Sequence, residues 1–273
     1  VTPERGGTEP RPGALFRIVQ CLEGTVRMRS RCIPRPDNGL VEPVFDLLSN
    51  DARSGAFRFT APGPWELDAE AHAIDHWITM SAGERCAYAL SGPGMESDGD
   101  PYAALDGTLA YWHGWSARCS YIGPYRTAVV RSVLTLKLLH DQDTGAIAAA
   151  PTTSLPEEIG GVRNWDYRFC WIRDASFTLH ALMRAGYMDE DVALFRWLFR
   201  TVKLEGPELH VLYPLSAEGD VEERVLEHLE GYRWSKPVRV GNAAARQMQL
   251  DVFGEVLDAI HLACTQGLQD PHP

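Results

Sequence analysis

Residues 160–176, which read GGVRNWDYRFCWIRDAS, combine aromatic and charged side chains at high density in a chain of 273 residues. Neighbouring Arg and Asp side chains are costly to bury without a partner, so this stretch is poor core material. Aromatic faces can stack on the C–H faces of a sugar ring, while carboxylate and guanidinium groups bind hydroxyls strongly. The stretch therefore favours a polar ligand with weakly apolar faces, such as a sugar. It contains Arg163, Trp165, Asp166, Tyr167, Arg168, Phe169, Trp171, Arg173 and Asp174.

Other patterns that could carry chemistry are weaker. His72 and His76 have a spacing that would suit zinc on a helix, but their surroundings alternate like a strand and no third ligand suggests itself. Residues 152–154 (TTS) lack the Gly-x-Ser-x-Gly setting of a serine hydrolase. The sequence has no glycine-rich phosphate loop and no dinucleotide fingerprint. We therefore expect neither a metal site nor an organic cofactor.

The elements that must position the aromatic stretch change character along the chain. Residues 1–13 are rich in Pro and Gly, which predicts a disordered lead. Apolar and polar residues then alternate in short runs separated by turn signals at 37–39 and 62–64, which predicts an all-β domain over residues 14–100, most simply a sandwich. The predicted strands are 15–19, 25–29, 56–60 and 74–79.

The period becomes helical near residue 101. Residues 102–119 predict a helix in a linker that we place at 101–125, and residues 126–140 predict a strongly amphipathic helix, with Val130, Leu134 and Leu138 on one face. Further helices follow as far as residue 273. Their predicted apolar faces are Phe177, Ala181 and Leu182; Val192, Phe195, Leu198 and Phe199; and Leu250, Phe253, Leu257 and Ile260.

Charge and cysteine usage narrow the class of partner. The net charge of −11, from 37 acidic and 26 basic residues, argues against binding to nucleic acid or to an anionic membrane surface. No apolar run approaches the length of a membrane span. The six cysteines are scattered without a Cys-x-x-Cys pair, which predicts free thiols in a reducing compartment. No signal peptide is visible, so we expect a cytoplasmic protein.

With its flanks, the aromatic stretch resembles glycoside hydrolase family 15, which holds glucoamylases, glucodextranases and bacterial trehalases. The resemblance implies a β-sandwich followed by an (α/α)6 barrel of the six-hairpin glycosidase type. Such a barrel has twelve helices, and only about five are expected after residue 125, so we expect a chain truncated at both ends. It would hold a partial sandwich and, over residues 126–273, the N-terminal half of the barrel. The segments that carry the resemblance are RSVLTLKLL (131–139), TGAIAAAPTTSLPEEIGG (144–161), AGYMDEDVALFRWL (185–198) and HLEGYRWSKPVRVGNAAARQMQLDVFGEVLDAI (228–260).

A half barrel would expose a broad apolar seam, which is a liability for a monomer. A homo-oligomer is therefore an open alternative.

The family resemblance also implies a reaction. It predicts an inverting hydrolase of the glucoamylase type that releases glucose from the non-reducing ends of small or oligomeric α-glucosides, with trehalase action as the alternative. Such hydrolysis uses an acid and a base, both carboxyl groups. In the family these are glutamates beyond the matched segment, so we expect them downstream of residue 273 and assign no catalytic residue here. A fragment that only binds sugar is the second hypothesis, and a phosphorylase that would need a phosphate site is the third.

The resemblance assigns substrate-binding roles to residues of two loops. Arg173 and Asp174 match the pair that binds hydroxyls of the non-reducing glucose, and Trp171 matches the aromatic wall of the same subsite. Further members of the two loops are Trp165, Asp166, Arg239 and Asn242.

Plain structural interpretations compete with these assignments. An Arg–Asp pair can be an ordinary first-turn charge of a helix, and the tryptophans can be core residues. Glu157 and Glu158 look like a catalytic pair but are read as acids of a loop or a helix start. Asp166 and Asp174 could themselves form an acid–base pair, an alternative that the resemblance disfavours because the family uses these positions for binding.

Overall fold

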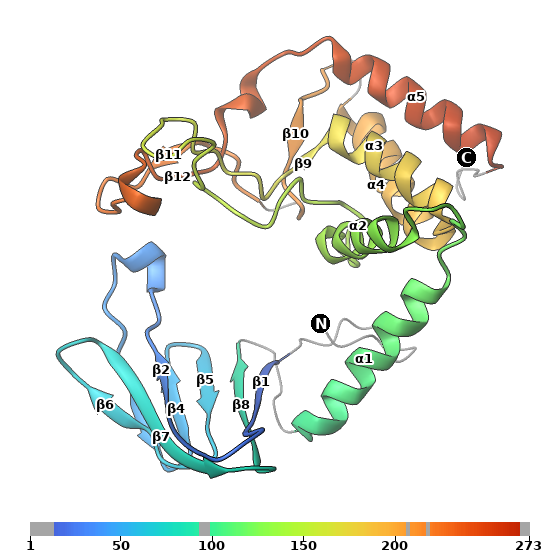
Figure 1. The fold of residues 1–273 in the computed structure, drawn as a ribbon. Helices are drawn as coiled ribbons and strands as arrows, with labels where there is room; N and C mark the ends of the chain where they lie inside the picture. Colours follow the sequence, from blue (N-terminus) through green and yellow to red (C-terminus); the bar gives the residue numbers. More distant parts are fainter. Residues whose placement is uncertain (1–13, 93–98, 206–207, 217–218, 268–273) are drawn as a thin grey trace. The chain divides into compact units, whose positions relative to one another are not determined.

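The computed structural model describes residues 14–92, 99–205, 208–216 and 219–267. The chain divides into two compact units, residues 1–114 and 115–273, and the division falls within helix α1 (Pro101–Ala117). The first unit contains antiparallel sheets and the second is mainly helical (Figure 1). The predicted order of a β region followed by a helical region is therefore confirmed. The half barrel stays a prediction, and the predicted disordered lead at 1–13 lies outside the described residues.

Strands of the first unit form a five-stranded sheet in the order β1-β8-β5-β4-β3 and a three-stranded sheet in the order β2-β7-β6. All strand pairs in both sheets are antiparallel. Four strands were predicted (β1, β2, β5 and β7). The other four, β3, β4, β6 and β8, were not predicted. β3 and β6 have only three residues, too few to give a clear alternation. The strands are β1 (Leu15–Gln20), β2 (Thr25–Cys32), β3 (Asp46–Leu48), β4 (Asp51–Ser54), β5 (Phe57–Thr60), β6 (Glu66–Asp68), β7 (Ala73–Ser81) and β8 (Arg85–Ser91).

The two sheets share one apolar core, which contains Phe59 of β5, Ile74 of β7 and Tyr88 of β8. His76 of β7 lies in the same region, where its Nδ1 atom is 2.9 Å from the Tyr88 hydroxyl. Burial lowers the pKa of His76, because the charged form of the ring is disfavoured away from water. His72 is partly exposed beside Glu42, so the two histidines have different surroundings.

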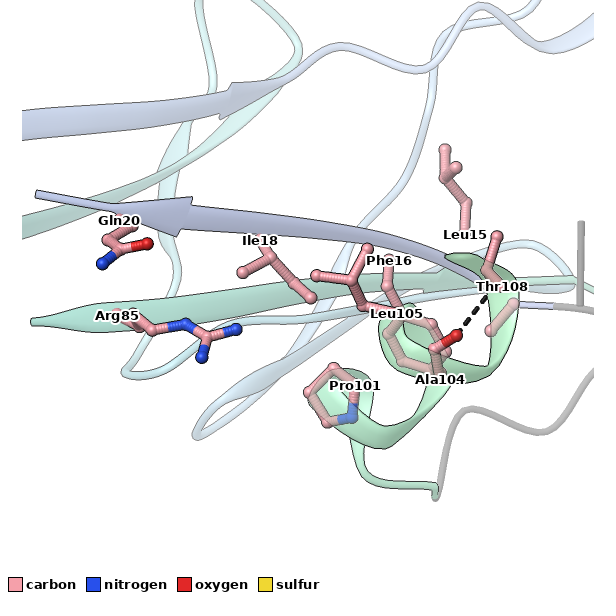
Figure 2. Close-up of a pocket in the computed structure, with 10 residues that line it drawn as sticks. Leu15, Phe16, Ile18, Gln20, Arg85, Pro101, Ala104, Leu105 and Thr108 are labelled. Atoms are coloured by element: carbon pink, nitrogen blue, oxygen red, sulfur yellow. Dashed lines mark hydrogen bonds between the residues drawn. The ribbon is translucent and has the colours of Figure 1, made fainter. Parts of the chain in front are cut away.

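An open pocket of about 410 Å³ lies between β1 and the first turns of α1, within the first unit (Figure 2). Ile18 of the strand and Leu105 of the helix line it, and Arg85 is at one end. The Arg85 guanidinium carbon lies 4.3 Å from the ring centre of Tyr102, the second residue of the helix. This contact is a cation–π interaction that joins β8 to the start of α1.

Four helices follow in the second unit, with α3 packed against α2, α4 and α5. α3 is amphipathic, buries Leu179 and Leu182, and ends at Gly186, whose φ of +90° is the left-handed conformation typical of a helix end. The helices are α2 (Arg126–Leu139), α3 (Ile172–Ala185), α4 (Met188–Glu205) and α5 (Asp251–Thr265). The short elements of the whole chain are η1 (Pro36–Gly39), β9 (Cys170–Trp171), β10 (Leu212–Tyr213), β11 (Arg224–Val225), η2 (Tyr232–Trp234), β12 (Arg239–Val240) and η3 (Ala243–Arg246).

Three of the predicted apolar faces differ from those that are buried. In α5 the predicted Leu257 is exposed, as is Leu250 just before the helix, because the buried face is made of small side chains that lie against α3 and α4. Phe177 of α3 and Leu138 of α2 are also exposed. The face predicted for 192–199 of α4 is correct, since Phe195 and Leu198 are buried and Val192 and Phe199 are half-buried. The buried residues of α5 are Val252, Val256, Ala259 and Ala263.

On α2 a charged residue, Lys137, is buried instead of Leu138. Its ammonium lies 3.3 Å from a carboxylate oxygen of Glu190, a buried residue of α4. The same oxygen accepts a hydrogen bond from the indole of Trp115 (2.6 Å), and Arg118 lies at 3.2 Å. Burial alone would raise the pKa of Glu190, but these partners hold it below its ordinary value. The carboxylate therefore links the end of α1, α2 and α4.

The cysteines carry no disulfide. All six thiols are free, as their scattered positions predict. Cys170 is fully buried, and burial raises its pKa to about 12, which makes it unreactive as a nucleophile. In the described part of the chain, no helix combines the length and the apolar character needed to cross a lipid bilayer.

Candidate functional site

The aromatic stretch begins as one arm of an extended hairpin between α2 and α3. Its backbone pairs with the preceding segment, with hydrogen bonds from Ala150 to Tyr167 (3.0 Å), from Tyr167 to Thr152 (3.1 Å) and from Ser154 to Trp165 (2.9 Å). Successive side chains of an extended chain point to opposite faces. The alternation of aromatic residues at 167, 169 and 171 therefore gathers three rings, and the Trp171 ring centre lies 5.9 Å from that of Tyr167 and 6.4 Å from that of Phe169.

The arm leads through β9 into α3, whose first turn carries Arg173 and Asp174. The guanidinium of Arg173 lies 3.3 Å from the carboxylate of Asp174 and 3.9 Å from that of Asp251, at the start of α5. The Arg173 and Asp174 side chains are 45% and 39% exposed, so each keeps polar atoms available to a ligand. The start of a helix favours a carboxylate electrostatically, which stabilises Asp174 where it lies.

A pocket of about 260 Å³ lies beside Asp174. Leu136 and Leu139 of α2 and Phe177 of α3 give it apolar walls, and Asp174 is the charged residue among those that line it. Apolar surface can contact the C–H face of a sugar ring while the neighbouring carboxylate binds the hydroxyls of that ring. The remaining lining residues are Ile147, Ala148, Ala149, Thr178 and Ala181.

Asp166 has a different environment, although it belongs to the same stretch. It is fully buried, and its carboxylate accepts hydrogen bonds from the Arg168 backbone N–H (3.1 Å) and the Gly241 N–H (3.1 Å). The Arg168 guanidinium donates two more, at 2.9 Å and 2.7 Å. Both carboxylate oxygens are therefore occupied within the protein, and they join the hairpin arm to the loop after β12.

Asn242 joins the same two segments. Its Nδ2 atom donates to the carbonyl of Asp166 at 3.0 Å, and its Oδ1 atom accepts from the N–H of Ala244 at 3.0 Å, which caps η3. Asn242 is also buried. The side chain of Asn242 therefore holds the backbone of the hairpin arm and of η3 in place, as the side chain of Asp166 holds the arm and the loop after β12.

Arg239 lies over the ring of Trp165, with 4.7 Å between the guanidinium carbon and the ring centre. Its Nη1 atom donates to the carbonyl of Val162 at 3.0 Å, and its Nε atom is 3.3 Å from the Glu223 carboxylate. Its backbone is held by Ser154, whose hydroxyl accepts from the Arg239 N–H and donates to the Arg239 carbonyl, both at 2.7 Å. The guanidinium is thus held over the indole.

The seven residues predicted to bind substrate form two groups. Four of them make one hydrogen-bonded and stacked cluster, which contains Trp165, Asp166, Arg239 and Asn242. The other three lie at β9 and the first turn of α3, where Trp171 is buried while the Arg173–Asp174 pair is partly exposed.

Several residues of the site were not predicted. Ser154 and Asn164 are buried and bind the loop 235–239 through hydrogen bonds to Arg239, Ser235 and Pro237. Hydroxyl and amide side chains in a loop give no sequence signal that separates this role from solvent exposure. Arg168 could have been found, because an Arg two residues after an Asp on an extended arm lies on the same face.

Glu157 and Glu158 are exposed in a loop, in agreement with their interpretation as loop acids. Glu157 lies 3.7 Å from the guanidinium of Arg163 and accepts a hydrogen bond from the Tyr167 hydroxyl at 3.4 Å. Burial raises the pKa of Tyr167, and the Glu157 charge raises it further. In the described residues, no group of three or more His, Cys, Asp or Glu side chains could hold a metal ion.

Comparison with known proteins gives the same family for this region. Residues 123–272 match the model of glycosyl hydrolases family 15. A trehalase of Thermoplasma volcanium is 42% identical over 171 residues, which are 63% of this chain and 27% of that protein. Trehalases of Mycolicibacterium smegmatis and Mycobacterium tuberculosis are 32% and 33% identical over 94% of this chain, which corresponds to 41% and 40% of their own lengths.

The chain therefore spans about two fifths of the mycobacterial trehalases and about a quarter of the Thermoplasma protein. No solved structure gives a significant match. The family match covers more than half of the chain and contains the whole hairpin, both site loops and helices α2 to α5. The chain belongs to glycosyl hydrolases family 15.

Proposed function

We propose that the protein is an α-glucoside hydrolase that acts on trehalose, and that this chain supplies the subsite for the non-reducing glucose. The observation that carries the proposal is the partly exposed Arg173–Asp174 pair beside the 260 Å³ pocket. The curated relatives that match are named trehalases, which favours trehalose over the maltooligosaccharides expected for a glucoamylase.

In this proposal Asp174 and Arg173 bind glucose hydroxyls directly. A carboxylate accepts from hydroxyl hydrogens and a guanidinium donates to hydroxyl oxygens, so together they define where the donors and acceptors of the ring must lie. Trp171 is buried at the same end of α3, so we assign it to packing beneath the pair rather than to sugar contact. Fixing the ring in this way orients the glycosidic bond before reaction, and orientation can contribute about 7–11 kcal/mol to lowering a barrier.

The second group supports the subsite from the neighbouring loops. Trp165 offers a half-buried aromatic surface, and Arg239, whose side chain is 14% exposed, lies over its ring and is held by the loop. Asp166 and Asn242 are buried and hydrogen-bonded, so we assign them to holding this surface rather than to sugar contact.

We assign no acid or base to a residue of this chain. Asp166 is fully buried with both oxygens occupied, and Asp174 is paired with Arg173. Neither setting suits a group that must exchange a proton with the glycosidic oxygen or with water. The 273 residues are therefore expected to bind glucose units without releasing glucose.

Calorimetric titration with glucose, trehalose and maltotriose tests the proposal. We expect the chain to bind all three and Asp174→Ala to weaken binding at least about tenfold, the usual effect of losing a charged hydrogen bond. Asp189→Ala is the matched control, because Asp189 is an exposed acid on α4. Equal affinities for wild type and Asp174→Ala would refute the subsite. Tighter binding of maltotriose than of trehalose would favour glucoamylase action over trehalase action.

A further inference from the structure

The pocket between β1 and the first turns of α1 follows the strand along its length (Figure 2). Its lining includes both Leu15, at the start of β1, and Gln20, at the end, and five steps of an extended strand cover about 17 Å. The pocket volume of about 410 Å³ is typical of sites that hold small organic ligands. A long ligand therefore fits this pocket better than a compact one.

Small side chains on the sheet leave the space beside the helix open. Phe16 of β1 is paired with Ala89 of β8, and Ile18 is paired with Ala87. Residues directly opposite each other in an antiparallel pair lie on the same face, so alanines adjoin the two larger side chains there. Leu105 of α1 lines the pocket from the helix. Apolar surface of this kind favours a ligand with an apolar body.

One end of the pocket carries a positive charge. Gln20 and Arg85 are paired directly across the two strands, and Figure 2 shows their side chains together at this end. Arg85 is exposed, and its guanidinium lies over the neutral ring of Tyr102, which does not cancel its charge. Towards the other end, the hydroxyl of Thr108 donates to a carbonyl of its own helix. The pocket is therefore polar at one end and apolar along the rest of its length.

Two carboxylates near Arg85 and the helix start have other partners. Glu84 accepts a hydrogen bond from the N–H of Ser81 in the hairpin turn, and Asp100 accepts one from the N–H of Tyr102 at the start of α1. A guanidinium binds a carboxylate strongly, often through two parallel hydrogen bonds. The charge of the pocket is therefore complementary to a ligand that carries a carboxylate at one end.

We infer that this pocket binds a free medium-chain fatty acid, with the carboxylate at Arg85 and Gln20 and the alkyl chain along Phe16, Ile18 and Leu105. The guanidinium and the glutamine amide donate to the carboxylate oxygens, and the chain covers apolar surface that water otherwise contacts. This inference goes beyond the proposed function and uses residues of the first unit alone.

Calorimetric titration of the 273-residue chain with decanoate and hexanoate tests the apolar part of the pocket. We expect one decanoate per chain. Each fully buried CH₂ group strengthens binding about fourfold, so hexanoate, which is four CH₂ groups shorter, should bind at least about tenfold more weakly even when the chain is only partly buried. Equal affinities for the two acids, or no binding of decanoate by the wild type, would overturn the inference.

Two substitutions test the location and the charge. Arg85→Gln should weaken decanoate binding about tenfold, whereas Arg17→Gln, which removes an exposed arginine of the same strand that does not line the pocket, should change nothing. Ala104→Phe places a ring in the open pocket and should abolish binding, with an unchanged urea midpoint as the check on folding. Equal decanoate affinities in Arg85→Gln and Arg17→Gln would overturn the inference, as would full affinity in Ala104→Phe. The comparison of the two arginine variants decides the matter if Ala104→Phe does not fold.

Discussion

Replacing Asp166 with Asn tests whether the buried carboxylate holds the site loops together. The change keeps the shape of the side chain but replaces one acceptor oxygen with an NH₂ donor. In the wild type, Oδ1 accepts from the backbone N–H and Nε of Arg168, and Oδ2 accepts from Nη2 of Arg168 and the N–H of Gly241. Whichever way the amide turns, its NH₂ group faces two donors.

The magnitude follows from these contacts. Leaving a buried donor without an acceptor costs about 1–3 kcal/mol, and breaking a buried ion pair on one side costs about 3–5 kcal/mol. The Arg168 guanidinium is half-exposed, so water can satisfy it after the change. In one orientation of the amide the buried N–H of Gly241 loses its acceptor, and in the other the backbone N–H of Arg168 does. We therefore expect Asp166→Asn to lower the free energy of unfolding by about 2–4 kcal/mol.

Urea unfolding followed by tryptophan fluorescence measures the effect, with Asp220→Asn as the control. Asp220 also pairs with an arginine, but both partners are exposed, and such pairs contribute about 0–1 kcal/mol. A double-mutant cycle with Arg168→Ala separates the ion pair from the Gly241 contact. A loss below about 0.5 kcal/mol in Asp166→Asn, equal to that of the control, would refute the reasoning.

Two further predictions concern the second unit. Burial and the neighbouring Lys137 lower the pKa of His140 to about 4, below the ordinary unfolded value of about 6.5. The neutral imidazole of His140 therefore stabilises the fold fully above pH 6.5, and this stabilisation is lost as the pH falls towards 4. Wild type should lose about 2–3 kcal/mol more than His140→Leu between pH 7 and pH 4.5 in urea titrations, and parallel pH profiles would contradict this. Gly241→Ala would place a Cβ atom 1.9 Å from the carbonyl oxygen of Glu222 at a φ of +75°, so we expect the free energy of unfolding to fall by more than about 3 kcal/mol. Gly254→Ala is the control: it lies within α5, where a Cβ atom would meet no neighbour, and it should raise the free energy of unfolding by about 0.5–1 kcal/mol. Similar urea midpoints for the two variants would show that the backbone near Gly241 can move to accept the Cβ atom.

Periodicity predicted the order of elements because it reports which residues face a core. It predicted β7 and the boundaries of α2 to within a residue or two. It failed for the buried face of α5, where Leu257 is larger and more apolar than the alanines that are buried. Apolar character ranks residues by the free energy of transfer, but close packing of helices selects small side chains at the contact.

The buried Lys137 could not have been predicted for a related reason. A lysine in a helix is normally solvated, and the residues near Lys137 in sequence do not indicate that it pairs with Glu190. Its position depends on Glu190 of α4, whose carboxylate pairs with the ammonium and also accepts a hydrogen bond from the indole of Trp115 in α1. Long-range pairs of this kind leave no periodic signal in one chain.

The candidate site shows most clearly what residue type alone leaves open. Asp166 and Asp174 lie in one short run and have similar neighbours in sequence, each next to or near an Arg. Asp166 is on an extended arm whose opposite face gathers the aromatic rings, so its carboxylate points into the loops behind and is saturated there. Asp174 is in the first turn of a helix, where its carboxylate stays partly exposed beside a pocket. The change from strand to helix at Trp171 therefore divides one charged motif into a part that builds the site and a part that is free to meet a ligand.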